Sequence, residues 1–292
     1  MPTWRQYRRE LGASLGWHLY SSQSATGAAS SAAQVVIPDL IDTNLEAEFL
    51  DNTWEFQTSG ANAYEVRRPK AGGLAPASGV VTLSRAHTAA TSSGQPIEFY
   101  GVLPPTQHLG RRGLLQCANQ ALRECWFIDH LSITGVSTAY QYGLSSTYPW
   151  LYSEDQVVDV NVRQSGATRD RLVGEWRLVN DVDTPQLEFK SPFATNDTIK
   201  PIVYRPLDTW IRVNSTWTDS TVGLSTETDE ALLPLDGMLT VGLYYCYETL
   251  AGLGKDTGKW EAMRDRQRAA ANAWKTAHLP RLQGRDRYSH WR

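Results

Sequence analysis

The sequence has few of the residues that build disulfide frameworks and metal sites. Its 292 residues include three cysteines, Cys117, Cys125 and Cys246, and no Cys-x-x-Cys pair, which argues against a disulfide framework and against a zinc site. No two of the six histidines have metal-ligand spacing on one predicted helix, and no HExxH, Walker-type or GxGxxG motif occurs. We therefore expect no catalytic residue, no cofactor and no metal, and we predict that the protein is not an enzyme.

The sequence also lacks a long apolar run and a strong charge of either sign. No apolar stretch approaches the length of a membrane span, and "MPTWRQYRRELG" is too charged for a signal peptide. The net charge of −3 gives no overall nucleic-acid signature. With 41% hydrophobic and 20% charged residues, the composition is that of a globular protein. We expect synthesis in a cytoplasm and no membrane partner.

Apolar residues recur at helical spacing in three parts of the chain. These parts are residues 4–19, residues 105–127, and a hairpin of two helices at 233–277 that is broken at Gly252 and Gly254. In the first helix, Arg5, Arg8 and Arg9 fall on the side opposite the apolar stripe, so we expect them to face solvent. The residues predicted to pack in a helical core are Trp4, Leu11, Leu115, Leu122, Leu239, Leu243, Leu250, Trp260 and Trp274.

The remaining segments follow the pattern of strands and turns. Short apolar or alternating runs are separated by Asp, Asn, Gly and Pro, as is typical of antiparallel sheets. Val158, Val160 and Val162 alternate with polar residues, which predicts a half-buried strand. Residues 35–101 and 129–233 are therefore predicted to be β-rich.

The two patterns together predict an α+β fold. We expect a bundle of about four helices, taken from the N-terminus, middle and C-terminus of the chain, with inserted antiparallel segments that resemble a sandwich or barrel. An isolated helical hairpin buries too little apolar surface to be stable, so it needs the other helices as partners. The predicted domains are a discontinuous helical core (1–20, 102–128 and 234–280), a β-rich segment (35–101) and an inserted β-rich domain (129–233).

The C-terminal segment 281–292 is predicted to be a docking arm. It is rich in arginine, carries two large aromatic residues and has too little apolar content for a core element. A frayed solvated tail is the alternative, although such tails seldom carry two large aromatic side chains. The predicted partner-binding residues are Arg281, Arg285, Arg287, Tyr288, Trp291 and Arg292.

Several stretches resemble the head–tail connector (adaptor or neck) proteins of tailed double-stranded DNA bacteriophages. These stretches are "TWRQYRRELGASLG", "LIDTNLEAEFLDNTWEFQTSG", "LLQCANQALRECW" and "LLPLDGMLTVGLYYCYETLAG". The matching positions are Leu40 to Asp42, Trp54, Asn119 to Trp126, Pro234 to Leu250 and Ala269 to Ala277. The β-rich insertion between about 129 and 233 departs from the shortest, mostly helical family members.

The resemblance implies a structural virion protein at the head–tail interface. It implies a homo-oligomeric ring, commonly a dodecamer, that lies beneath the portal protein, extends the DNA channel and joins tail or neck proteins. Packaged DNA would pass through the channel without sequence specificity, and the docking arm would bind the portal.

Two other functions remain open from the sequence. Another virion component, such as a tail terminator, neck or baseplate protein, would also combine strands with an oligomerising helix. A β-sandwich that binds or hydrolyses carbohydrate is motivated by the many Trp and Tyr residues and by paired carboxylates such as Asp229 and Glu230.

Overall fold

The chain forms two compact units, seen here in a computed structural model. Unit 1 comprises Met1–Ala121, Arg212–Thr216 and Leu224–Ala271, and unit 2 comprises Leu122–Ile211, Trp217–Gly223 and Asn272–Arg292. The residues described are 1–17, 19–25, 31–37, 54–62, 65–75, 78–100, 111–136, 139–144, 148, 150–151, 156–179, 186–252 and 257–280.

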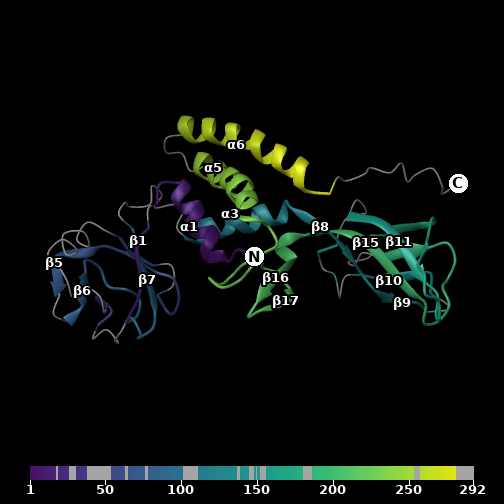
Figure 1. The fold of residues 1–292 in the computed structure, drawn as a ribbon, viewed down its shortest axis with the longest axis horizontal. Helices are drawn as coiled ribbons and strands as arrows, with labels where there is room; N and C mark the ends of the chain where they lie inside the picture. The colour runs from purple at the N-terminus through teal and green to yellow at the C-terminus, as the bar shows by residue number, and fades with distance from the viewer. Residues whose placement is uncertain are drawn as a thin grey trace. The chain divides into compact units, whose positions relative to one another are not determined.

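Unit 1 contains two small antiparallel sheets (Figure 1). The first has the order β1-β7-β3-β4, with β1 Leu19–Ser24, β7 Pro96–Tyr100, β3 Trp54–Gln57 and β4 Val66–Arg67. The second has the order β2-β6-β5, with β2 Gln34–Val36, β6 Val80–Leu83 and β5 Pro69–Ala75. The two sheets share a core of Ala25, Val35, Ile37, Val81, Leu83, Ile97 and Phe99.

The described helices of the chain range in length from 3 to 22 residues. They are α1 Trp4–Ser14, α3 Arg111–Arg123, α4 Leu235–Gly237, the π-helical turn η4 Met238–Gly242, α5 Leu243–Gly252 and α6 Thr257–His278. Helix α1 begins with a capping box, in which the Gln6 backbone N–H donates to Thr3 Oγ1 and the Thr3 N–H donates to Gln6 Oε1. The boundary between the units falls within α3 and within α6.

Within unit 1, helices distant in the sequence pack on one another. A Cβ atom at Gly242 of η4 would lie 3.4 Å from Leu11 Cδ2, an ordinary contact distance, so η4 packs directly on α1. The Cys117 Sγ of α3 lies 3.6 Å from the Thr249 Oγ1 of α5. Helices α5 and α6 run side by side (Figure 1), and the rings of Tyr247 and Trp260 stack at 6.0 Å.

Unit 2 is built around two antiparallel sheets that share one core. One sheet has the order β12-β11-β15-β8, with β9 also paired to β15, and its strands are β12 Arg171–Leu172, β11 Val157–Arg163, β15 Thr198–Pro206, β8 Trp126–His130 and β9 Ile133–Thr134. The other has the order β10-β14-β13, with β10 Gln141–Gly143, β14 Gln186–Phe189 and β13 Trp176–Val179. Val160, Val203, Leu187 and Phe189 represent both sheets in this core, as expected for a sandwich.

The chain after β15 makes two further elements that matter for the candidate site. A 3₁₀ turn, η3 Leu207–Thr209, follows β15 directly. Strands β16 Trp210–Val213 and β17 Thr216–Asp219 then form a two-stranded sheet. Within the described residues, no helix combines the length and the apolarity that a membrane span requires.

The predicted fold class, a helical bundle with inserted β segments, is wrong. The structure is 34% strand and 30% helix, and its strands form several small antiparallel sheets among the described residues. Helical periodicity is conspicuous in the sequence, but the strands outweigh the helices and carry two sheet cores of their own. Helix α1 also packs through a charged residue, because the buried Arg8 pairs with Glu98 of strand β7.

The predicted alternation at residues 158–163 is correct for only part of the strand. Val160 and Val162 are buried in β11, but Val157 takes the next buried position in place of Val158. The pairing of β11 with β15 shifts register between Val157 and Asp159, as at a β-bulge. A bulge adds one residue to one strand and so reverses the faces of the residues beyond it.

Candidate functional site

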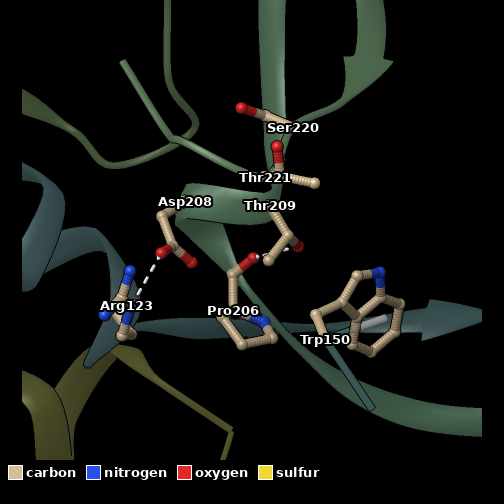
Figure 2. A pocket seen from close by; sticks show the side chains of 7 residues that line it. All are labelled: Arg123, Trp150, Pro206, Asp208, Thr209, Ser220 and Thr221. Atoms are coloured by element: carbon tan, nitrogen blue, oxygen red, sulfur yellow. Dashed lines mark hydrogen bonds and ion pairs between the residues drawn. The ribbon is translucent and has the colours of Figure 1, made fainter. Parts of the chain in front are cut away.

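A pocket of about 230 Å³ lies in unit 2, where β15 ends and η3 begins (Figure 2). Pro206 ends the strand, and Asp208 and Thr209 form the turn. The other lining residues come from the end of α3, from residue 150 and from the segment after β17; they are Arg123, Trp150, Ser220 and Thr221. The Ser220 N–H donates to the Thr209 carbonyl oxygen at 2.9 Å, which joins two sides of the pocket.

Asp208 contributes a buried carboxylate to this pocket. Its side chain is 9% exposed, and the Arg123 Nε donates to its Oδ2 at 3.0 Å. The Oδ1 is also buried and has no hydrogen-bond partner. Figure 2 shows this second oxygen on the side away from Arg123, towards Pro206. Burial raises the pKa of Asp208, and the hydrogen bond and charge of Arg123 offset only part of that rise.

Trp150 contributes a second buried polar atom without a partner, its indole Nε1. The residue is 8% exposed, and the guanidinium carbon of Arg205 lies 5.0 Å from the centroid of its ring. The same guanidinium lies 4.4 Å from the ring centroid of Trp210, which in turn stacks on Trp217 at 6.2 Å. Cation–π contacts of this kind favour arginine over lysine, because the planar guanidinium stacks on the rings.

Arg205 holds the turn beside the pocket in place. Its Nε donates to Thr209 Oγ1 at 3.0 Å, and its Nη2 donates to the Thr209 carbonyl oxygen at 2.8 Å. The Nη1 bonds Asp129 Oδ2 at 3.0 Å, and the Nη2 also pairs with Asp219. The side chain is 5% exposed, so these contacts satisfy a buried charge. Arg205 therefore fixes the conformation of η3 and hence the position of Asp208.

The pocket can hold a small polar group but offers little for catalysis. Asp208 is the one carboxylate among the described residues that line it. Among the described residues, no group of three or more His, Cys, Asp or Glu side chains has the arrangement of a metal site. The polar groups of the lining residues are the Asp208 carboxylate, the Arg123 guanidinium, the buried indole N–H of Trp150 and the hydroxyl groups of Thr209, Ser220 and the exposed Thr221.

The residues predicted to pack in a helical core have different degrees of burial. Trp4, Leu11 and Leu122 are fully buried, and Leu243 and Leu250 are nearly so. The neighbours of two others occupy the buried positions: Leu114 and Met238 are fully buried, whereas Leu115 and Leu239 are half-buried. The π-helical turn at Met238–Gly242 changes the helical period at this point, so a strict 3.6-residue pattern misplaces the stripe.

Helix α6 is mostly exposed along its 22 residues. Ala271 is its one fully buried residue among those described, and Trp260 and Trp274 are half-buried. The exposed residues include five alanines, which cluster on the side of the helix opposite Ala271: Ala262, Ala269, Ala270, Ala273 and Ala277. We call this side the alanine face of α6. The six predicted docking-arm residues and the predicted motif Leu40 to Asp42 lie outside the described residues.

The structure corrects one prediction in unit 1 and reveals a site that the sequence did not indicate. Arg8, predicted to face solvent, is 1% exposed and pairs with Glu98 and Glu227. His87, which no motif singled out, lies between two carboxylates, with Nε2 2.9 Å from Glu55 Oε2 and Nδ1 2.8 Å from Glu65 Oε2. Glu55 is 32 residues and Glu65 is 22 residues away from His87 in the sequence, so no local pattern links them.

One further sequence pattern is explained by its position in the fold. Residues 12–16, Gly-Ala-Ser-Leu-Gly, match the GxSxG pattern of a nucleophile elbow. They lie at the end of helix α1 and in the turn after it, where the Trp17 N–H donates to the Gly12 carbonyl oxygen. A nucleophile elbow needs a strand before the serine and a helix after it, so the match carries no catalytic meaning.

The chain matches no protein-family description, no curated protein and no solved structure.

Proposed function

We propose that the protein is a structural component of a tailed double-stranded DNA phage, a head–tail connector that forms a ring beneath the portal. The resemblance of its helical segments to connector proteins suggests this function. The observation that carries it is helix α6, which has 22 residues and a single fully buried one among those whose burial is described. Helices in proteins owe most of their stability to packing. A long helix that its own chain leaves mostly exposed is therefore expected to pack against another subunit.

The alanine face of α6 gives this proposal a specific surface. Alanine side chains are short, so two helices that meet through them can approach closely over a long contact. A ring requires a heterologous interface, in which one surface of a subunit packs against a different surface of the next. We propose that the alanine face is one of these two surfaces. The predicted docking arm, residues 281–292, would then bind the portal.

Electron microscopy of the purified chain, alone and mixed with purified portal protein of the same phage, tests the ring. We expect class averages with closed rotational symmetry, twelvefold by the resemblance, at least when portal is present. A protein that stays monomeric under both conditions contradicts the proposal. Binding to purified tail tube instead of portal would favour a tail terminator.

A pair of substitutions tests the alanine face. Ala269→Glu combined with Ala273→Glu places two charges on it, and we expect loss of the ring with the fold unchanged by circular dichroism. The control is Ala13→Glu, the same change at an exposed alanine of α1. Rings that survive the double substitution would exclude this face from the interface.

Removal of residues 281–292 tests the docking arm separately. We expect the truncated chain to form rings but to co-sediment with portal more weakly than the full chain. Unchanged co-sedimentation would show that the arm does not bind the portal.

A further inference from the structure

We propose that the pocket of unit 2 binds a single sugar residue, or a ring of the same chemistry that carries several neutral hydroxyl groups. The proposal goes beyond the connector function and does not depend on it. The pocket lies between Trp150, Pro206 and Asp208, with Thr221 and Arg123 at its other sides (Figure 2).

The size of the pocket suits one small ring. Its volume of about 230 Å³ is several times the roughly 30 Å³ that one water molecule occupies in the liquid. Pockets for drug-sized ligands begin at about 300 Å³ and extend to about 1,000 Å³. The pocket therefore has room for more than a bound water and less than an extended ligand.

The charges around the pocket favour a neutral ligand. Arg123 and Asp208 form an ion pair with 3.0 Å between Nε and Oδ2, so their charges largely cancel. A cationic ligand near the free Oδ1 would lie close to the Arg123 guanidinium. An anionic ligand near that guanidinium would lie close to the Asp208 carboxylate. Desolvated like charges at such distances are unfavourable, whereas a neutral hydroxyl group meets neither repulsion.

The unpaired polar atoms match what hydroxyl groups provide. Asp208 Oδ1 is an acceptor without a donor, and Trp150 Nε1 is a donor without an acceptor. A buried polar group that lacks a partner costs about 1–3 kcal/mol, so a ligand that pairs with it gains affinity. A hydroxyl group both donates and accepts. Both atoms are buried, so the lining side chains have to shift before a ligand hydroxyl reaches them.

The pocket walls supply the apolar surface that a sugar ring also needs. The Trp150 indole and the Pro206 ring lie on two sides of the pocket in Figure 2. The C–H face of a sugar packs well on such rings, because it is apolar while its hydroxyl groups point outward. Arg205, stacked on Trp150, holds the indole in place before a ligand arrives. With one carboxylate in its lining, the pocket is built for binding and not for hydrolysis.

Saturation-transfer NMR on the full-length protein tests the proposal. The probes are glucose, galactose, mannose and N-acetylglucosamine, with ethylammonium and acetate as charged comparisons. We expect a transfer signal from at least one sugar and a larger signal from it than from either ion. Asp208→Ala removes the free acceptor, and we expect binding to weaken about tenfold. The matched control, Glu175→Ala, removes an exposed carboxylate that does not line the pocket and should leave binding unchanged.

A second variant keeps the test decisive if Asp208→Ala fails to fold. Thr221→Val replaces an exposed hydroxyl group at the pocket by a methyl group of similar size, and we expect weaker sugar binding with an unchanged near-UV circular dichroism spectrum. The proposal is overturned if none of the four sugars gives a signal. It is also overturned if the signal is the same in folded Asp208→Ala or Thr221→Val, or if ethylammonium or acetate binds better than every sugar.

Discussion

Arg8 and Glu98 form an ion pair in which neither side chain is more than 1% exposed, with 2.7 Å between Nη1 and Oε2. Helix α1 supplies the arginine and strand β7 the glutamate. The Tyr100 hydroxyl group accepts from Arg8 Nη1 and donates to Glu98 Oε2, and Glu227 takes a second side of the guanidinium. Burial alone would raise the pKa of Glu98, but the hydrogen bond and charge of Arg8 lower it to about 2. Glu98 is therefore ionised at neutral pH.

We expect Glu98→Leu to destabilise unit 1 by about 3 kcal/mol, because it removes one of the two carboxylates that pair with a buried arginine. Amide hydrogen exchange in α1 and β7 is the measurement, since it reports local stability in a chain of two units. Glu175→Leu is the control: it removes an exposed acid that pairs with Lys190, and it should cost less than about 1 kcal/mol. Equal exchange rates in the two variants would mean that the buried pair contributes no more than a surface pair.

The site at His87 makes unit 1 sensitive to pH. Burial lowers the pKa of His87, but the hydrogen bond and charge of Glu55 and the hydrogen bond of Glu65 outweigh it and raise the pKa above its usual value, with Arg67 opposing them. The charged imidazolium then stabilises the fold fully below about pH 6.5, the pKa in an unfolded chain. This contribution is lost as the pH rises through the higher pKa of the folded state.

We therefore expect amide exchange in β3 and β4 to speed up between pH 6 and pH 9 beyond the intrinsic pH dependence. The His87→Gln variant should lack this additional acceleration, whereas His130→Gln, a change at an exposed histidine of β8, should retain it. An NMR titration that places the His87 pKa below 6.5 would contradict the argument directly.

Sequence patterns predict features that depend on neighbouring residues, and they miss features that depend on residues far apart in the chain. The helix pattern predicted the burial of Trp4 and Leu11 in α1 and of Leu122 in α3, because apolar periodicity is a local signal. The same pattern placed Arg8 in solvent. Its partners lie 90 and 219 residues away along the chain, at Glu98 and Glu227, and no periodicity records them.

Backbone irregularities account for other differences. The bulge between Val157 and Asp159 moved the buried position from Val158 to Val157, and the π-helical turn moved it from Leu239 to Met238. The π-helical turn changes the helical period by a fraction of a turn, and the bulge shifts the alternation of the strand by one residue. No residue type marks either irregularity. The pocket could not be predicted from the sequence either, because Asp208 resembles an ordinary turn residue until the fold places Arg123 and Trp150 beside it.

Arg205→Lys tests whether guanidinium geometry, and not charge alone, holds the pocket. Lysine keeps the charge but loses the planar stacking between Trp150 and Trp210 and most of the bonds to Thr209. We expect the amides of η3 and of Ser220 to exchange about tenfold faster or more. Arg163→Lys, at an exposed ion pair with Asp170, is the control and should change little. If η3 exchanged at the same rate in Arg205→Lys as in the unchanged protein, Arg205 would act only as a counter-ion for Asp129 and Asp219.

Among the described glycines of unit 1, Gly79 is the one with the closest overlap for an added side chain. Its φ of +65° is in the left-handed region, and a methyl group there would overlap the carbonyl oxygen of Ile37. The Ile37 N–H donates to the Gly79 carbonyl oxygen at 2.8 Å, so the backbone cannot move aside without loss of the contact between the β2 and β6 segments. Gly94 has a similar φ of +81°, but nothing lies within 4 Å of its added methyl group.

The two glycines therefore separate backbone strain from steric overlap. We expect Gly94→Ala to cost about 1–2 kcal/mol, the usual cost of a left-handed residue with a side chain. Gly79→Ala should cost several kcal/mol, because the strain is joined by a clash with backbone. Amide exchange of Val35 and Val81, which face each other in the β2–β6 pair, measures the difference. We expect it to be at least about a hundredfold faster in Gly79→Ala than in Gly94→Ala, and equal rates would mean that β2 moves freely away from β6.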